Sequence, residues 1–379
     1  MAISQNVSTT RQPTIADRLQ YKSATPDNSS HALKIYDTFE PSRQGDTWVP
    51  GHGAHVAEAA RSSGFQGSIV AQENQTADNV IKALVMTRNQ MAVPGQTSEQ
   101  VLGLLDQHVQ FGSQALMLKA AQSLTEDTKA GVTGGVTNFS LAAAPSGDAD
   151  QLYNDIRLGW TPPQPGEPEG TDFRRQAGTG MMNNLARAWN IDPGHLTSPD
   201  PAVYGPARAK FQQKLIDRVH QAQQSKAVQD VHKFYGQAVD AYESKGNSVV
   251  VAAGNEGFLL DQMKIDNGGQ ALTAPKNFEK NVLATPSTTV VGASGVRGFD
   301  AVGKPFYSPA PYSNRDGVTI YASGDLPSGQ GTSYAAPRVA ALMTELHQTY
   351  PGLSSAQIEN LARHQLSDQP LAPGISEVR

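Results

Sequence analysis

The run SVVVAA at residues 248–253 constrains the fold more than any other feature of this 379-residue sequence. It has the length of a β-strand, shows no alternation of polar and apolar residues, and ends at Gly254. A strand of this kind must be covered on both faces, as in a parallel sheet that has helices on either side. Four further short runs have strand character, at residues 32–36, 131–141, 288–292 and 318–322.

Segments with helical spacing of apolar residues separate these runs. They comprise residues 52–63, 76–90, a helix that begins after Thr97, two helices within 207–245, and residues 332–350 and 354–363. Thr97 and Gln100 have the spacing of a capping box, which marks a helix start. Strands that alternate with helices predict an α/β fold whose mostly parallel central sheet has helices on both faces.

The sequence predicts a short arm, one large domain and an irregular segment within that domain. Residues 1–30 are polar and predict a flexible amino-terminal arm, and residues 31–379 predict one domain with a large insertion at about 145–225. Residues 145–200 lose clear periodicity and carry four prolines between positions 162 and 168, so we expect a loop there.

Composition excludes several classes of protein. The chain has no cysteine, which removes disulfides, thiolate metal sites and cysteine nucleophiles. A net charge of −5 without any basic run argues against a nucleic-acid partner, and no apolar run approaches the ~18 residues of a membrane span. The polar amino terminus lacks the apolar core of a signal peptide, so we expect a cytoplasmic protein, or export by a route that needs no signal peptide.

Four polar residues stand at the ends of predicted elements. Asp37 ends the first apolar strand, His52 opens a helix, Asn255 follows the buried strand, and Ser333 opens an apolar helix. Ligands of parallel sheets gather at the carboxyl ends of the strands. Taken one at a time, each residue has an ordinary structural role as a helix cap, a turn residue or a packed histidine.

Taken together, the four side chains suit nucleophilic catalysis. A serine hydroxyl becomes reactive when an imidazole removes its proton, and a buried carboxylate can orient that imidazole. The oxyanion that forms needs fixed donors, which the Asn255 amide and the Ser333 backbone N–H at a helix start can supply.

Three segments resemble the signature blocks of the subtilisin-like serine proteases. They are His52–Ala57 (HGAHVA), Ala252–Gly257 (AAGNEG) and Gly331–Pro337 (GTSYAAP). The order aspartate, histidine, serine is also that of the family. The aspartate block departs from the family pattern, because Phe39 stands where a glycine is usual.

The resemblance implies a subtilisin-like fold and a serine endopeptidase that acts through an acyl-enzyme on a polypeptide substrate, without a cofactor. Ser333 would be the nucleophile, His52 the general base, Asp37 its orienting carboxylate and Asn255 an oxyanion donor.

A further block resembles the substrate-binding strand of the family. It is Asn138–Leu141 (NFSL), followed by Ala142 in place of the usual glycine. The resemblance implies that substrate is bound by Ser140, Leu141, Ala142, Ala253 and Gly254.

Other interpretations stay open. His52 and His55 have the i, i+3 spacing of a metal pair, but Asp37 is the only evident carboxylate near them, so we expect no zinc and expect His55 to support the site from behind. The calcium-binding stretch that is usual in the family after the histidine block is missing here, so the resemblance does not extend to a calcium site, and the sequence leaves calcium dependence open. A peptide-binding pseudoenzyme and a processing or ligating enzyme for one partner are alternative functions. The insertion could be a lid that restricts substrates or a solvent-facing decoration.

Overall fold

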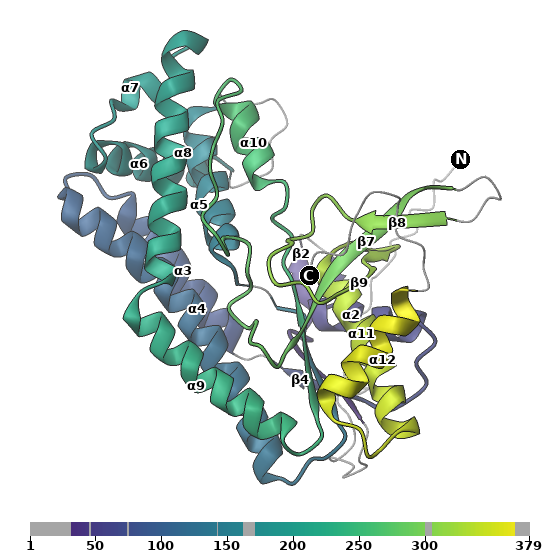
Figure 1. Ribbon diagram of the computed structural model, residues 1–379. Coiled ribbons are helices and arrows are strands. Elements are labelled where there is room, and N and C mark those ends of the chain that lie inside the picture. Colours follow the sequence, from purple (N-terminus) through teal and green to yellow (C-terminus); the bar gives the residue numbers. More distant parts are fainter. Residues whose placement is uncertain are drawn as a thin grey trace, which may run out of the picture.

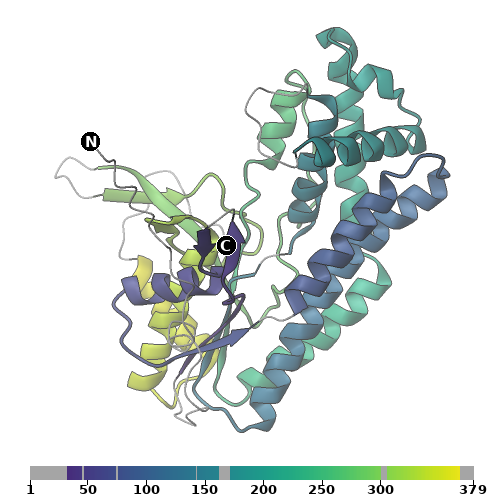
Figure 2. The same cartoon turned by 180° about the vertical axis from the view of Figure 1, so that it is seen from behind.

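The computed structural model describes residues 32–44, 47–73, 76–141, 143–161, 171–299 and 305–367. The arm predicted for residues 1–30 lies outside them. Figures 1 and 2 show a central sheet between helices and, on one side, a helical bundle that extends past the end of the sheet. No helix in the described ranges has the length and apolar character needed to cross a membrane.

The central sheet is mostly parallel, as predicted. Its path is β4-β1-β5-β6-β7-β8, and β9 also pairs with β7. All described pairs in it are parallel except β7 with β8. The strands are β1 (Leu33–Asp37), β4 (Ile69–Glu73), β5 (Val136–Phe139), β6 (Ser248–Ala252), β7 (Thr289–Phe299), β8 (Pro305–Pro309) and β9 (Ile320–Ser323). Two short hairpins lie outside this sheet, β2 (Ser42–Gln44) with β3 (Thr47–Val49) and β10 (Asp325–Leu326) with β11 (Gly329–Gln330).

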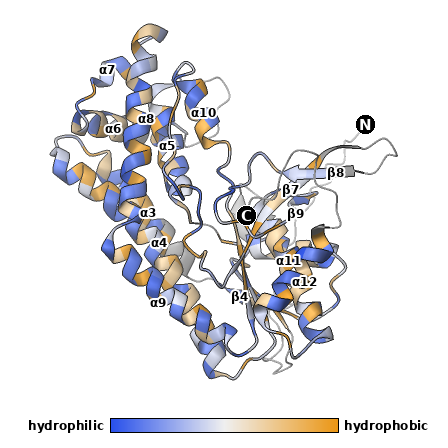
Figure 3. Ribbon diagram, viewed as in Figure 1, coloured by the Kyte–Doolittle hydropathy of each residue, from blue (hydrophilic) through white to orange (hydrophobic). Residues whose placement is uncertain are grey.

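Helices cover both faces of the sheet. On one face lie α2 (His52–Ser62), α11 (Thr332–Thr349) and α12 (Ser355–Ser367), and on the other lie α4 (Ser98–Lys129) and α9 (Lys226–Glu243). Successive residues of β6 alternate between the two cores: Val250 packs with the first group and Val251 with the second. This double burial is why the positions from Val249 to Ala252 are all apolar. Figure 3 shows the same distribution, with apolar residues concentrated on the strands and on α11.

The capping box predicted at Thr97 is present at the start of α4. The Thr97 hydroxyl accepts a hydrogen bond from the Gln100 amide, and the Gln100 side chain accepts one from the Thr97 amide. The two residues satisfy each other's backbone donors and lie three positions apart. Their spacing in the sequence is therefore enough to locate this helix start.

The helical bundle has a hydrophobic core of its own. It contains α3 (Thr76–Met91), α5 (Pro145–Trp160), α6 (Thr171–Ala188), α7 (Pro193–Leu196), α8 (Pro201–Gln223), α10 (Leu259–Asp266) and the first part of α4. Fully buried members of this core include Leu152, Leu185 and Leu215 from the predicted insertion. Leu105 lies before that range and Met263 after it, so the bundle draws on segments outside residues 145–225.

The loop expected at residues 145–200 is wrong, because helices α5, α6 and α7 occupy most of this range. Pro145 and Pro193 stand at the first positions of α5 and α7, where a missing amide proton costs no hydrogen bond. Glycine also has a packing role here: a Cβ at Gly178 would clash with the carbonyl oxygen of Asp155, so α6 approaches α5 closely. The four prolines between 162 and 168 lie outside the described residues.

Candidate active site

Asp37 and His52 meet where β1 ends and α2 begins. The Asp37 side chain is buried, and its Oδ1 accepts a hydrogen bond of 2.7 Å from the Thr38 amide. His52 Nδ1 lies 2.9 Å from Asp37 Oδ2 and 3.0 Å from Oδ1. This contact directs the other ring nitrogen, Nε2, away from β1.

His52 Nε2 lies 3.1 Å from the Oγ of Ser333, 281 residues further along the chain. Ser333 is the second residue of α11, whose start is set by Gly331. The structure therefore brings three of the residues predicted from the sequence into one line of contacts, from carboxylate to imidazole to hydroxyl.

The charge of Asp37 controls the imidazole. Burial lowers the pKa of His52, but the hydrogen bond and the charge of Asp37 outweigh it, so the pKa is raised from its ordinary value of 6.5. His52 is thus neutral, and able to accept a proton, only at a pH above this raised value.

Asn255 is held by the residue before the serine. Its Oδ1 accepts hydrogen bonds from the Thr332 amide (2.8 Å) and the Thr332 hydroxyl (3.1 Å). The Nδ2 group then faces the space beside Gly331, where a Cβ would lie 3.6 Å from it and 3.0 Å from Ser333 Oγ. The amide of Ser333 has no acceptor among the described residues. Two N–H donors therefore border the space next to the serine hydroxyl.

Two of the predicted substrate-binding residues, Ser140 and Gly254, contact the segment that carries the serine. The Ser140 hydroxyl donates to the Ser333 carbonyl at 2.9 Å, and so binds the helix that carries the serine. The Gly254 amide donates to the Thr332 hydroxyl at 3.1 Å, and Ala253 is buried. Leu141 is half-buried. Ala142 lies outside the described residues.

The two histidines of the possible metal pair have other contacts in the structure. Both ring nitrogens of His52 face other groups, and His55 Nδ1 lies 3.5 Å from Glu58 Oε2 on its own helix. The expected support of the site by His55 stays a prediction. No group of three or more metal-ligating side chains occurs in the ranges that the structure describes.

Two residues that flank Ser333 were not identified from the sequence. Thr332 fixes the Asn255 amide, and the Tyr334 ring stacks on His52 with a centroid distance of 5.9 Å and an interplanar angle of 28°. Both lie inside the segment Gly331–Pro337. The sequence therefore points to the segment, but it does not reveal what each side chain contacts.

Comparison with solved structures finds weak similarities to proteases. A cold-adapted subtilisin-like serine proteinase is 14% identical, with 92% of this chain and 88% of that chain covered and a TM-score of 0.36. A lanthipeptide protease is 11% identical over 88% and 79%, with a TM-score of 0.37. MycP1 from the ESX-1 type VII secretion system is 15% identical over 91% and 76%, with a TM-score of 0.34. The sequence identities and TM-scores are too low for these structures to support an assignment of family or function.

No curated protein sequence matches the chain. The model of the subtilase family matches residues 120–376, which is more than half of the chain. The matched part contains Asn255 and Ser333 and begins after Asp37 and His52. On this match, the chain belongs to the subtilase family of serine proteases.

Proposed function

We propose that this subtilase is an endopeptidase that hydrolyses peptide bonds through an acyl-enzyme on Ser333. The observation that carries the proposal is the unbroken line of contacts from Asp37 through His52 to the Ser333 hydroxyl. In it, Asp37 orients the imidazole, His52 is the general base and then the general acid, and Asn255 is a donor to the oxyanion.

Acylation begins when Ser333 Oγ attacks the carbonyl carbon of the substrate and its proton passes to His52 Nε2. The carbonyl oxygen takes up the negative charge and accepts hydrogen bonds from Asn255 Nδ2 and the Ser333 amide. The C–N bond then breaks as His52 Nε2 gives its proton to the leaving nitrogen, and the amine product departs.

Deacylation repeats the sequence with water. Water loses a proton to His52 Nε2 and attacks the ester carbonyl, and the Ser333 oxygen recovers the proton as it leaves. Asp37 stays ionised throughout and stabilises the imidazolium in both halves of the reaction.

The helical bundle supports a restricted choice of substrate. α5 begins at Pro145, shortly after Ser140, and α10 begins at Leu259, shortly after Asn255. The bundle is thus rooted at the two segments expected to bind substrate, and it extends past the carboxyl ends of β5 and β6 (Figures 1 and 2). We favour a lid over a solvent-facing decoration for this reason.

A fluorophosphonate probe tests the nucleophile. We expect covalent labelling of the wild-type chain at Ser333 and none in Ser333→Ala, whereas Ser63→Ala, at the exposed end of α2, labels normally. A folded wild-type chain that is not labelled would favour the peptide-binding scaffold. Cleavage of a peptide library, with and without an added amine acceptor, then separates broad hydrolysis, restricted processing and ligation.

The lid is tested by loosening the bundle at Arg208. Its guanidinium donates to the carbonyls of Leu196 (2.8 Å) and Asp266 (2.9 Å), and so joins α8 to the ends of α7 and α10. Arg208→Ala should broaden the set of peptides cleaved without changing the labelling of Ser333. Lys210→Ala, on the exposed side of the same helix, is the control. An unchanged cleavage profile in a loosened bundle would assign selectivity to the cleft strands instead.

A further inference from the structure

We propose that Glu73, at the end of β4, is a positioning residue for the Asp37–His52 pair. Its carboxylate holds the turn that follows Asp37, and this turn holds both members of the pair. The inference rests on the proposed function, since it assigns a part in the same site to a residue from the neighbouring strand.

The first contact joins Glu73 to the turn. Asp37 and Glu73 are paired positions at the ends of β1 and β4. Glu73 Oε2 accepts a hydrogen bond of 2.8 Å from the Phe39 amide, and the backbone of Glu40 also interacts favourably with the Glu73 carboxylate. Phe39 stands where the family pattern has a glycine, so this turn carries a large side chain. The Glu73 carboxylate, from the neighbouring strand, holds the turn through its backbone.

The second contact joins the turn to the helix of His52. The Thr38 carbonyl accepts a hydrogen bond of 2.8 Å from the Gly53 amide. A Cβ on Gly53 would lie 2.7–2.9 Å from the Phe39 ring, so the ring packs directly on the backbone next to His52. A Cβ on Gly51 would lie 2.5 Å from the Thr38 carbonyl oxygen, and this contact confines the turn from the other side.

The third contact joins the turn to Asp37 itself. The Thr38 amide donates to Asp37 Oδ1 at 2.7 Å. A displacement of the turn would therefore move two things at once. It would shift the Thr38 amide that donates to Asp37, and it would shift the start of the helix that carries His52. Misplacements of about 1 Å in such a site can cost about 100-fold in rate.

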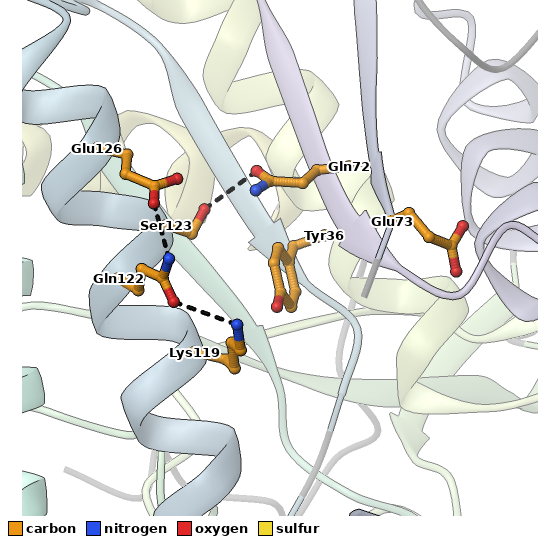
Figure 4. A pocket seen from close by; sticks show the side chains of 7 residues that line it. All are labelled: Tyr36, Gln72, Glu73, Lys119, Gln122, Ser123 and Glu126. Carbon is orange, nitrogen blue, oxygen red and sulfur yellow. Dashed lines mark hydrogen bonds between the residues drawn. The ribbon is translucent and has the colours of Figure 1, made fainter. Parts of the chain in front are cut away.

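Glu73 also borders a polar pocket of about 110 Å³ between the end of the sheet and α4. Figure 4 shows its carboxylate directed away from Gln72 and Ser123, which hydrogen-bond to each other across the pocket. Asp37 of β1 and Glu40 of the turn act on Glu73 through their charges, whereas Tyr36 of β1 and Lys119 and Glu126 of α4 line the same pocket.

Two opposing effects act on the ionisation of Glu73. Burial and the charges of Glu40 and Asp37 raise its pKa, whereas the two backbone hydrogen bonds from the turn favour the carboxylate. The net pKa of Glu73 is raised, so its carboxylate takes up a proton at a higher pH than an ordinary glutamate does. The hydrogen bonds, rather than the charge, are the property that the site needs.

Three variants separate these properties. Glu73→Ala removes the acceptor, Glu73→Gln keeps an acceptor oxygen without the charge, and Asp127→Ala is the matched control. Asp127 on α4 accepts two hydrogen bonds from Lys34, near the opposite end of the same strand β1. Where Glu73→Ala does not fold, Glu73→Asp replaces it, because its carboxylate is one methylene too short to reach the Phe39 amide.

We expect Glu73→Ala to lower kcat about 10- to 100-fold with little change in KM, since the loss falls on alignment and not on substrate binding. Glu73→Gln should retain most of kcat, and Asp127→Ala should lower stability without lowering kcat. The pKa of His52, measured by NMR titration, should fall in Glu73→Ala towards the ordinary value because the contact with Asp37 loosens.

A folded Glu73→Ala variant with unchanged kcat and an unchanged His52 titration would overturn the inference. So would a Glu73→Gln variant as impaired as Glu73→Ala, or an equal loss of kcat in Asp127→Ala. The His52 titration needs no turnover, so it tests the positioning even in a wild-type chain that proves inactive, an outcome that would count against the proposed function alone.

Discussion

The candidate active site and the helical bundle differ in what holds them together. At the site, polar contacts join residues far apart in sequence, such as His52 with Ser333 and Asn255 with Thr332. In the bundle, apolar side chains of neighbouring helices make a continuous core, and ion pairs such as Arg88 with Asp155 tie helices together. Damage to the two regions should therefore separate: changes at the site should remove turnover with little loss of stability, and changes in the bundle should do the reverse.

The sharpest loss at the site is expected for His52→Ala. Without the imidazole the Ser333 proton has no acceptor, and we expect kcat to fall by more than about 10⁴-fold. The thermal midpoint of unfolding should change little, because the His52 side chain is 40% exposed. Steady-state kinetics and calorimetry check both statements. A variant that keeps substantial turnover would remove His52 from the mechanism.

Asn255→Ala should have the next largest effect. Its amide meets charge that exists only near the transition state, so we expect kcat to fall about 10²- to 10³-fold while KM changes much less. This range is the loss that follows removal of one oxyanion donor from a subtilisin. A change mainly in KM would instead assign Asn255 to substrate binding.

Asp155→Ala tests the bundle side of the comparison. Asp155 accepts from Arg88 at 2.6 Å and from Arg174 at 2.7 Å, so its removal leaves the half-buried Arg88 without this partner. We expect a loss of about 3 kcal/mol in the free energy of unfolding, measured with urea, and an unchanged rate of Ser333 labelling.

The matched control is Lys226→Ala, which removes an exposed i, i+4 pair with Asp230. It should cost less than about 0.5 kcal/mol. If Asp155→Ala slowed the labelling of Ser333 as much as it lowered stability, the two regions would not be separable.

The smallest effect concerns pH. Because the pKa of His52 is raised, the neutral base is lost at a higher pH than for a free histidine. The rise of kcat/KM with pH should therefore have its midpoint above 6.5. Asp37→Asn removes the charge that raises this pKa, so the midpoint of its residual activity should move down. A wild-type midpoint below 6.5 would show that burial outweighs Asp37.

Much of the α/β core could be predicted from the sequence because its signals are local. The strand at residues 248–252 is apolar from Val249 onward because Val250 and Val251 face different cores, and α4 begins at a capping box that two residues define. The helices within residues 145–200 escape such a prediction because proline is usually a mark of loops, whereas Pro145 and Pro193 begin helices here. The roles of the candidate site residues stay predictions until they are measured.

Local patterns in the sequence are enough to locate the apolar strands, many helix boundaries and the three short blocks that resemble those of subtilases, because each depends on neighbours within a few residues. Which distant groups meet is settled only when the elements pack. The Phe39 amide donates to Glu73, which lies 34 residues further along the chain, and no local pattern in either segment predicts that contact. The same holds for the bundle core, where Leu105 and Met263 join the helices of the predicted insertion. Such partners are selected by the packing of whole elements against one another, which a local pattern of residue types does not contain.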